Sequence, residues 1–275
     1  MPDLCPKRLL AGTVEFCGRS HNSPLFPCSR IDNMPMKPGW YVTLVGDPMD
    51  VAGLDDIFRE DDIKCLKEDD QWLLTAKSFE PLADAGQVQE AASELMEVVN
   101  GAMKLHFGEH NAVTVGNVIE IGADGTKRGI AMAMAAARMT IRGGRIRAVI
   151  TDGSGKEVPQ PPSPVVKWVR LTETDPVATE ILWLLSLPKQ DWFSIYKLHE
   201  LMEQGGGMDW AIRSGLTTKA EIGRLTGTAN NFSAAGRAAR HANLAAKPMT
   251  AQPMTLKEGT VLINLLATNW LNARC

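Results

Sequence analysis

The sequence predicts an α+β fold, in which an N-terminal part with a mainly antiparallel sheet and one long helix precedes an all-helical C-terminal part. Short β-branched and aromatic runs alternate with turn residues over residues 1–150. A proline-rich segment follows, and beyond it the apolar residues recur at helical spacing. We therefore expect an α+β domain at residues 1–150, a linker at residues 151–169 and an all-helical domain at residues 170–275.

The strands of the N-terminal part are expected where β-branched and aromatic residues stand between Gly, Pro or acidic turn residues. In chain order the expected strands cover residues 39–46, 71–79, 112–115, 118–121, about 130–141 and 145–150. Turns are expected at residues 123–125 and at Gly143-Gly144. Because tight turns join neighbouring strands, an antiparallel sheet is indicated.

One long helix is expected between the second and third of these strands. From Gln87 to about His106 the apolar residues recur every three or four positions. They are Val88, Ala91, Ala92, Leu95, Val99, Ala102 and Met103. This spacing places them in one stripe along a helix, which we expect to cover one face of the sheet.

Capping signals mark the first two helices of the C-terminal part. Asp175-Pro176 combines an N-cap residue with proline at the first helical position, and the apolar residues 177–187 follow before the next proline. Asp191 is expected to cap a second helix, which reaches Gln204 and ends at a run of glycines.

Three further helical segments are expected towards the C-terminus. Two of them cover residues 218–225 and 233–242, on either side of a turn at residues 226–231. Thr255 begins the last helix, and Glu258 stands three residues later, as in a capping box. The side chains expected on the buried side of this last helix are Leu262, Leu265, Leu266, Trp270 and Leu271.

Composition and charge exclude several classes of protein. The net charge of -3 and the pI of about 6.0 do not fit a protein that coats nucleic acid over its whole surface. No signal-peptide pattern opens the chain, and no apolar run approaches the roughly 18 residues that span a bilayer. We therefore expect a cytoplasmic protein that has no membrane partner.

The cysteines predict neither a disulfide framework nor a metal site. The chain has five of them at irregular spacing. Cys5, Cys17, His21 and Cys28 are of the types that bind zinc, but paired ligands of compact zinc sites stand about two to four residues apart, and these do not. We expect reduced thiols, no bound metal and no cofactor.

The strongest chemical signal lies in the segment that ends at His241. Between Asp209 and Lys247 the chain has six basic residues and two acidic ones. On a continuous helix Arg237 and His241 share a face, because they stand four residues apart. A cation beside a titratable imidazole can hold a phosphate and transfer a proton. The pattern favours Arg237 and His241 as catalytic residues that act on RNA.

Other residues of the same segment are expected to contact the nucleic acid. Arg240, Asn230 and Asn231 are suited to hydrogen bonds with phosphate or the 2′-hydroxyl of RNA. Arg224 and Lys219 add positive charge to this surface. The simpler alternative is a solvated helix face in which none of these residues meets a ligand.

The C-terminal part, from about Pro176 to Arg274, resembles the HEPN superfamily of helical domains. The resemblance lies in an apolar first helix, the sequence Trp192-Phe-Ser-Ile-Tyr-Lys-Leu-His-Glu200 on the second, an Arg…His segment and a capped closing helix. Members are often metal-independent ribonucleases of defence and toxin systems, and they work as dimers. The resemblance implies a homodimer and RNA cleavage by Arg237 and His241, although the family motif separates its Arg and His by more than three residues.

Two other interpretations of the same region stay open. Residues 219–226 resemble the first helix of a helix-turn-helix, with Gly227 in the turn and the helix from Ser233 directed towards a DNA groove. Alternatively, the chain is a non-catalytic adaptor whose helical domain dimerises and whose exposed aromatic residues contact a partner protein. A surface that binds phosphate loses affinity steeply as salt rises, whereas an adaptor has no such affinity for nucleic acid.

Overall fold

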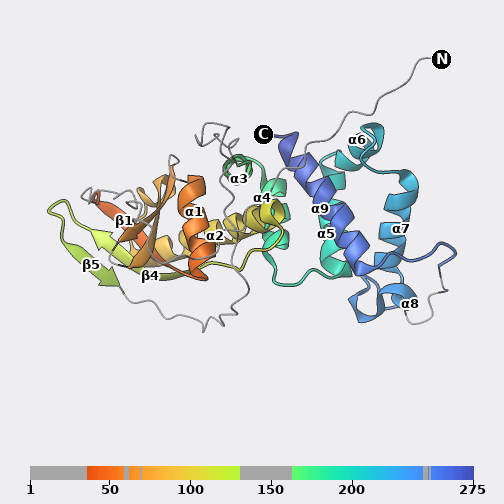
Figure 1. Cartoon of the computed structure of the whole chain (residues 1–275), viewed down its shortest axis with the longest axis horizontal. Helices are drawn as coiled ribbons and strands as arrows, with labels where there is room; N and C mark the ends of the chain where they lie inside the picture. The colour runs from red at the N-terminus through yellow and green to blue at the C-terminus, as the bar shows by residue number, and fades with distance from the viewer. Residues whose placement is uncertain (1–35, 59–61, 69, 131–162, 244–246, 248) are drawn as a thin grey trace, which may run out of the picture. The chain divides into compact units, whose positions relative to one another are not determined.

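The computed structural model describes residues 36–58, 62–68, 70–130, 163–243, 247 and 249–275 (Figure 1). Residues from Lys37 to Cys275 belong to one packed unit. The strands expected beyond residue 130, most of the linker and the four N-terminal Cys and His residues considered as metal ligands lie outside the described residues.

The N-terminal part contains an antiparallel sheet, as predicted (Figure 1). In the described residues its strand order is β2-β3-β1-β4-β5. The strands are β1 (Gly39–Val45), β2 (Ile63–Glu68), β3 (Gln71–Ala76), β4 (Thr114–Ile121) and β5 (Lys127–Ile130). The central strand β1 pairs Val42 with Leu74 of β3 on one side and with Val118 of β4 on the other.

Two details of the sheet differ from the prediction. The strands expected at residues 112–115 and 118–121 are one strand, β4, which continues through Gly116. A Cβ atom at Gly116 would lie 2.3 Å from Thr43 Oγ1, so glycine is required here by close packing rather than by a turn. Strand β2 was not predicted, because its charged and apolar residues lack the aromatic and β-branched runs of the other strands.

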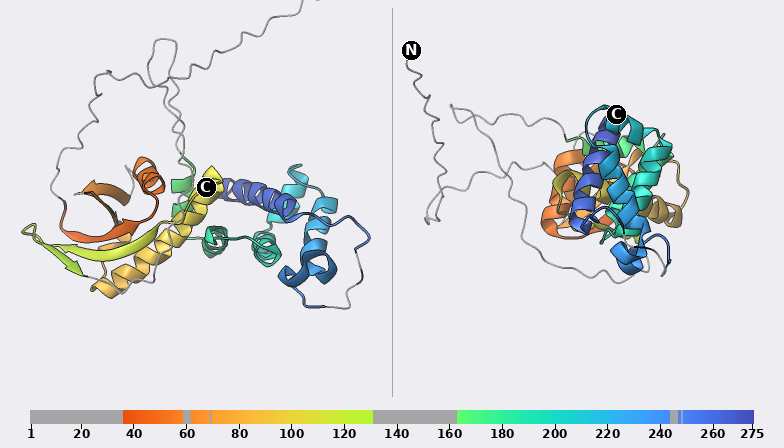
Figure 2. Two further views of the ribbon diagram at one scale, coloured as in Figure 1. Left: turned by 60° about the horizontal axis from the view of Figure 1, so that its bottom comes forward. Right: turned by 90° about the vertical axis from the view of Figure 1, so that its right-hand side faces the viewer.

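The sheet coils strongly, as the left view of Figure 2 shows. Strands β2 and β5 are at opposite ends of the strand order, yet Lys127 Nζ lies 2.6 Å from Glu68 Oε1. This ion pair lies on the same face of the sheet as three buried side chains, Tyr41, Leu73 and Ile121. Right-handed twist accumulated over the strands accounts for the approach of the two edges.

The other face of the sheet packs against two helices, α1 (Pro48–Phe58) and α2 (Ala85–Phe107). The predicted long helix is confirmed as α2, and Asp84 caps it by accepting a hydrogen bond from the Gln87 backbone N–H. Helix α1 was not predicted, because its short apolar stripe is interrupted by acidic residues.

Helix α2 also contacts the C-terminal part, which the sequence did not indicate. A Cβ atom at Gly101 would lie 1.8 Å from the carbonyl oxygen of Leu182, so only glycine allows this approach of two backbones. The core that surrounds the contact contains residues from both sides of the expected linker. Whether each part folds independently stays a prediction.

The C-terminal part is helical in its described residues, as predicted. Its elements are α3 (Val165–Leu171), α4 (Pro176–Ser186), α5 (Trp192–Gln204), α6 (Gly207–Arg213), α7 (Lys219–Asn230), α8 (Phe232–Ala235), the 3-10 helix η2 (Gly236–Ala238) and α9 (Leu256–Asn272). A further 3-10 helix, η1 (Lys77–Phe79), follows β3. The caps predicted at Asp175, Asp191 and Thr255 are confirmed. No described helix has both the length and the apolar character needed to cross a membrane.

Three predictions for the C-terminal helices are wrong. Helix α7 continues through Gly227, so no helix-turn-helix turn lies there, and α8 has four residues, too few for a recognition helix. The helix expected at residues 233–242 ends at Ala235, because Gly236 adopts a φ of 59° that a continuing α-helix does not allow. Leu265 of α9 is 45% exposed rather than buried.

Candidate functional site

The two predicted catalytic residues do not share a helix. Arg237 belongs to η2, and His241 follows it in irregular chain. Their four-residue spacing therefore no longer places them on a common helical face, which corrects the geometry on which the pairing was based. Both side chains are exposed, and within the described residues neither has a hydrogen bond or an ion pair. Their catalytic role stays a prediction.

Two of the residues predicted to contact nucleic acid, Arg224 and Asn231, make contacts within the local fold. The Arg224 Nε–H donates to the Gln252 carbonyl at 3.1 Å, and its guanidinium lies 3.9 Å from Glu258. The Asn231 side chain accepts from the Ser233 backbone N–H at 2.9 Å, which caps α8, and donates to the Lys247 carbonyl at 2.8 Å. These contacts engage the Arg224 Nε–H and the side-chain amide of Asn231, and a role of either residue in binding nucleic acid stays a prediction.

Lys219 and Asn230 lie at the two ends of α7. Lys219 is exposed at the first position of the helix. The Oδ1 atom of Asn230 is buried and accepts no hydrogen bond within the described residues. Lys219 therefore remains available to a ligand, whereas a contact with the Asn230 oxygen would require local opening.

Arg240 is the predicted residue that the fold positions most firmly. Its Nη2 atom lies 2.9 Å from Glu200 Oε1, and its guanidinium carbon lies 4.5 Å from the centroid of the Tyr196 ring. Its backbone N–H donates to the Ala229 carbonyl at the end of α7, at 2.8 Å. The structure thus brings Arg240 to α5, far from the position that a continuous helix after Ser233 would give it.

His199 is a buried histidine on α5. Its ring centroid lies 5.8 Å from that of Tyr196. Neither ring nitrogen has a hydrogen-bond partner in the described residues, because the nearest carboxylate oxygen, on Glu203, is 3.9 Å from Nδ1. Burial lowers the pKa of the imidazole, against the opposing effect of Glu203 and Glu200, so the neutral ring is favoured.

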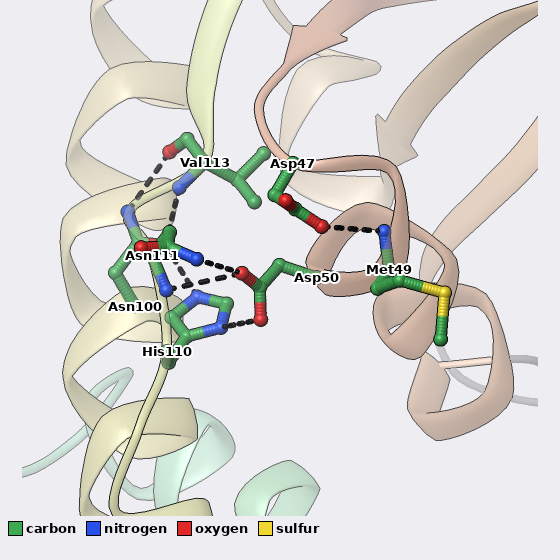
Figure 3. A network of polar contacts seen from close by, with 7 residues as sticks. All are labelled: Asp47, Met49, Asp50, Asn100, His110, Asn111 and Val113. Carbon is green, nitrogen blue, oxygen red and sulfur yellow. Dashed lines mark hydrogen bonds and ion pairs between the residues drawn. The ribbon is translucent and has the colours of Figure 1, made fainter. Parts of the chain in front are cut away.

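A second buried histidine, His110, belongs to a polar network that Figure 3 shows. Its Nδ1 atom lies 3.1 Å from Asp50 Oδ1, and its Nε2 atom lies 2.9 Å from Asn100 Oδ1. The orientation of the Asn100 amide follows from the Val113 backbone, whose N–H donates to Oδ1 and whose carbonyl accepts from Nδ2, both at 2.9 Å. Both ring nitrogens of His110 therefore face hydrogen-bond acceptors.

The other carboxylate oxygen, Asp50 Oδ2, accepts from the backbone N–H and the side-chain amide of Asn111, at 3.1 and 2.8 Å. These two donors offset the cost of burying the carboxylate. With side chains only 5% and 1% exposed, Asp50 and His110 are out of reach of a substrate and connect α1, α2 and the entry to β4.

Local sequence reading could not find this network, because Asp50 and His110 are 60 residues apart. His199 was detectable in principle, since an imidazole on the apolar stripe of a helix is a buried titratable group. A surface cavity of about 250 Å³ between α2, the end of α4 and α9 is lined by residues such as Lys104, Gln190 and Asn264, and by none of the predicted site residues.

Comparison with known proteins gives no further guide to the site. No protein-family model, no curated protein and no solved structure matches the chain. Function is therefore inferred from the side chains themselves.

Proposed function

We propose that the C-terminal helical part binds RNA through the exposed cationic residues that follow α8. The observation that carries this proposal is the state of Arg237 and His241, which are exposed and have no internal partner in the described residues. A cation that is not paired within the protein is available to a phosphate and releases bound counterions when it meets one. The resemblance to HEPN domains supports RNA as the nucleic acid.

Cleavage of the bound RNA is the stronger form of this proposal. Arg237 would hold the phosphate, and His241 would act as general acid or base towards an oxygen of the same phosphodiester. Arg237 lies in the short 3-10 helix η2 and His241 in the irregular chain just after it, so the proposed contact with one phosphate does not rest on a shared helical face.

The test is a filter-binding titration of labelled single-stranded RNA at two ionic strengths. We expect the affinity of the unchanged protein to fall as salt rises, and the Arg237→Ala/His241→Ala variant to show a shallower salt slope, by about 0.7 for each lost phosphate contact. Lys64→Ala is the matched control, because it removes one exposed positive charge from β2. If the double variant and the unchanged protein have equal salt slopes, the proposal is wrong. If the two proteins also cut the labelled RNA to the same products, the stronger form, cleavage by Arg237 and His241, is wrong.

The adaptor function is a second candidate, and α9 favours it. Val261 and Leu265 stand one turn apart on this helix and are 62% and 45% exposed. Exposed apolar residues in one stripe mark surfaces that contact another protein or a second copy of the chain. An adaptor would show concentration-dependent association in sedimentation that Val261→Glu/Leu265→Glu abolishes, together with no salt-dependent binding of RNA.

A further inference from the structure

We propose that Arg240 provides a flat stacking surface for one unpaired base of a single-stranded RNA. This inference rests on the proposed RNA-binding function and assigns a separate task to one residue of it. One face of the guanidinium lies over the ring of Tyr196, 4.5 Å from its centroid, and the Arg240 side chain is 35% exposed. Bases in single-stranded RNA stack on aromatic rings and on the planes of guanidinium groups.

The guanidinium is fixed before any ligand arrives. Tyr196 and Glu200 stand four residues apart on α5, so they lie on one face of that helix and hold the guanidinium from beneath and from its edge. The hydrogen bond from the Arg240 backbone to Ala229 anchors the other end of the residue. Such fixation reduces the conformational entropy that Arg240 would lose on binding.

Charge distinguishes the role of Arg240 from that of its neighbours. Glu200 engages Nη2 and offsets the positive charge of Arg240, which weakens its attraction for a phosphate. Arg237 and His241 have no such partner in the described residues. We therefore assign base stacking to Arg240 and phosphate contacts to the residues on either side of it.

The experiment uses the full chain and a single-stranded RNA that carries 2-aminopurine, whose fluorescence is quenched when the base stacks. The test variant is Arg240→Lys, which keeps the positive charge but has no planar group. We expect it to lose the quenching and to bind about tenfold more weakly, in the range measured for loss of one stacked base. Its salt slope should stay unchanged, because no charge is removed.

Tyr196→Phe and Tyr196→Leu complete the test. The Phe variant keeps the ring beneath Arg240 and should retain both quenching and affinity, whereas the Leu variant should lose them. If Arg240→Lys quenches and binds as well as the unchanged protein, the stacking role is wrong while salt-dependent RNA binding still stands. If the unchanged protein shows no salt-dependent RNA binding, the stacking role and the proposed function fail together.

Discussion

Two buried histidines of this protein have opposite surroundings. Each ring nitrogen of His110 faces a hydrogen-bond acceptor, one on Asp50 and one on Asn100. Neither ring nitrogen of His199 has a hydrogen-bond partner among the described residues, and burial favours its neutral form. A satisfied buried network stabilises a fold, whereas an unsatisfied polar group lowers its stability and is often found close to a functional surface.

The position of each histidine agrees with this difference. Through its hydrogen-bond network, His110 links the helices of the N-terminal part to the residues just before β4, away from any predicted contact with a ligand. His199 lies beside Tyr196, which supports the exposed Arg240. We infer that the His110 network is structural and that α5 near His199 is the less stable region of the two.

The largest effect on stability is expected from removing the Asp50 carboxylate, which contacts His110 and Asn111. Asp50→Ala leaves the facing His110 ring nitrogen and the two Asn111 donors without the oxygens they contact. We expect the free energy of unfolding to fall by about 3–5 kcal/mol, because each buried polar group left unsatisfied costs roughly 1–3 kcal/mol. Urea denaturation measures this change. Asp47→Ala is the control, because among the described residues that carboxylate accepts a hydrogen bond from the Met49 backbone N–H alone, at the surface, and its loss should cost about 1 kcal/mol. Equal losses in the two variants would show that the network is not specifically stabilising.

The same substitution at both histidines tests the comparison directly. His110→Leu should lower the free energy of unfolding by about 1–3 kcal/mol, because it removes two buried polar contacts, with Asp50 and with Asn100. His199→Leu removes two ring nitrogens that have no hydrogen-bond partner in the part of the chain that the structure describes, so it should leave stability unchanged or raise it. Thermal and urea unfolding of the two variants measure both changes. A larger loss in the free energy of unfolding for His199→Leu than for His110→Leu would contradict the comparison.

The pH dependence of stability should identify His199. Because the folded pKa of His199 is lowered, the unfolded chain binds a proton near the ordinary value of 6.5 while the folded chain does not. Stability should therefore fall as pH drops below about 6.5, by at most about 1.4 kcal/mol per pH unit from this residue. Unfolding measured from pH 7.5 to 5 should show this loss in the unchanged protein and a smaller one in His199→Leu.

The smallest effect, on the pKa of His199 and on stability at acid pH, is expected from a substitution of Glu203. Its carboxylate favours the charged imidazole, so Glu203→Gln should lower the pKa of His199 further and steepen the loss of stability at acid pH. The change should be slight because the Glu203 side chain is mostly exposed and therefore screened by solvent. NMR titration of the His199 ring would measure it, and a rise in the pKa would contradict the assignment of Glu203 as its neighbour.

Local signals predicted the helices well. Asp175, Asp191 and Thr255 each bind backbone N–H groups within their own first turn, so the sequence alone contains the information for these caps. The break at Gly236 was missed because the surrounding small residues are all compatible with a helix.

The site was much less predictable than the fold. The contact of Arg240 with Tyr196 and Glu200 depends on how the chain after α8 returns to α5. Likewise, the pairing of Asp50 with His110 depends on the packing of α1 against the end of α2. Neither arrangement leaves a pattern of spacing in the sequence.

The close approach at Gly101 has a practical consequence for dividing the chain. Because the α2 backbone lies directly against the carbonyl of Leu182, an endoprotease that cuts between residues 150 and 163 would sever the peptide without separating the fragments. The two pieces should elute together until a denaturant is added. A chain that starts at residue 163 would display the apolar surface of α4 that α2 normally covers, and would be prone to aggregate.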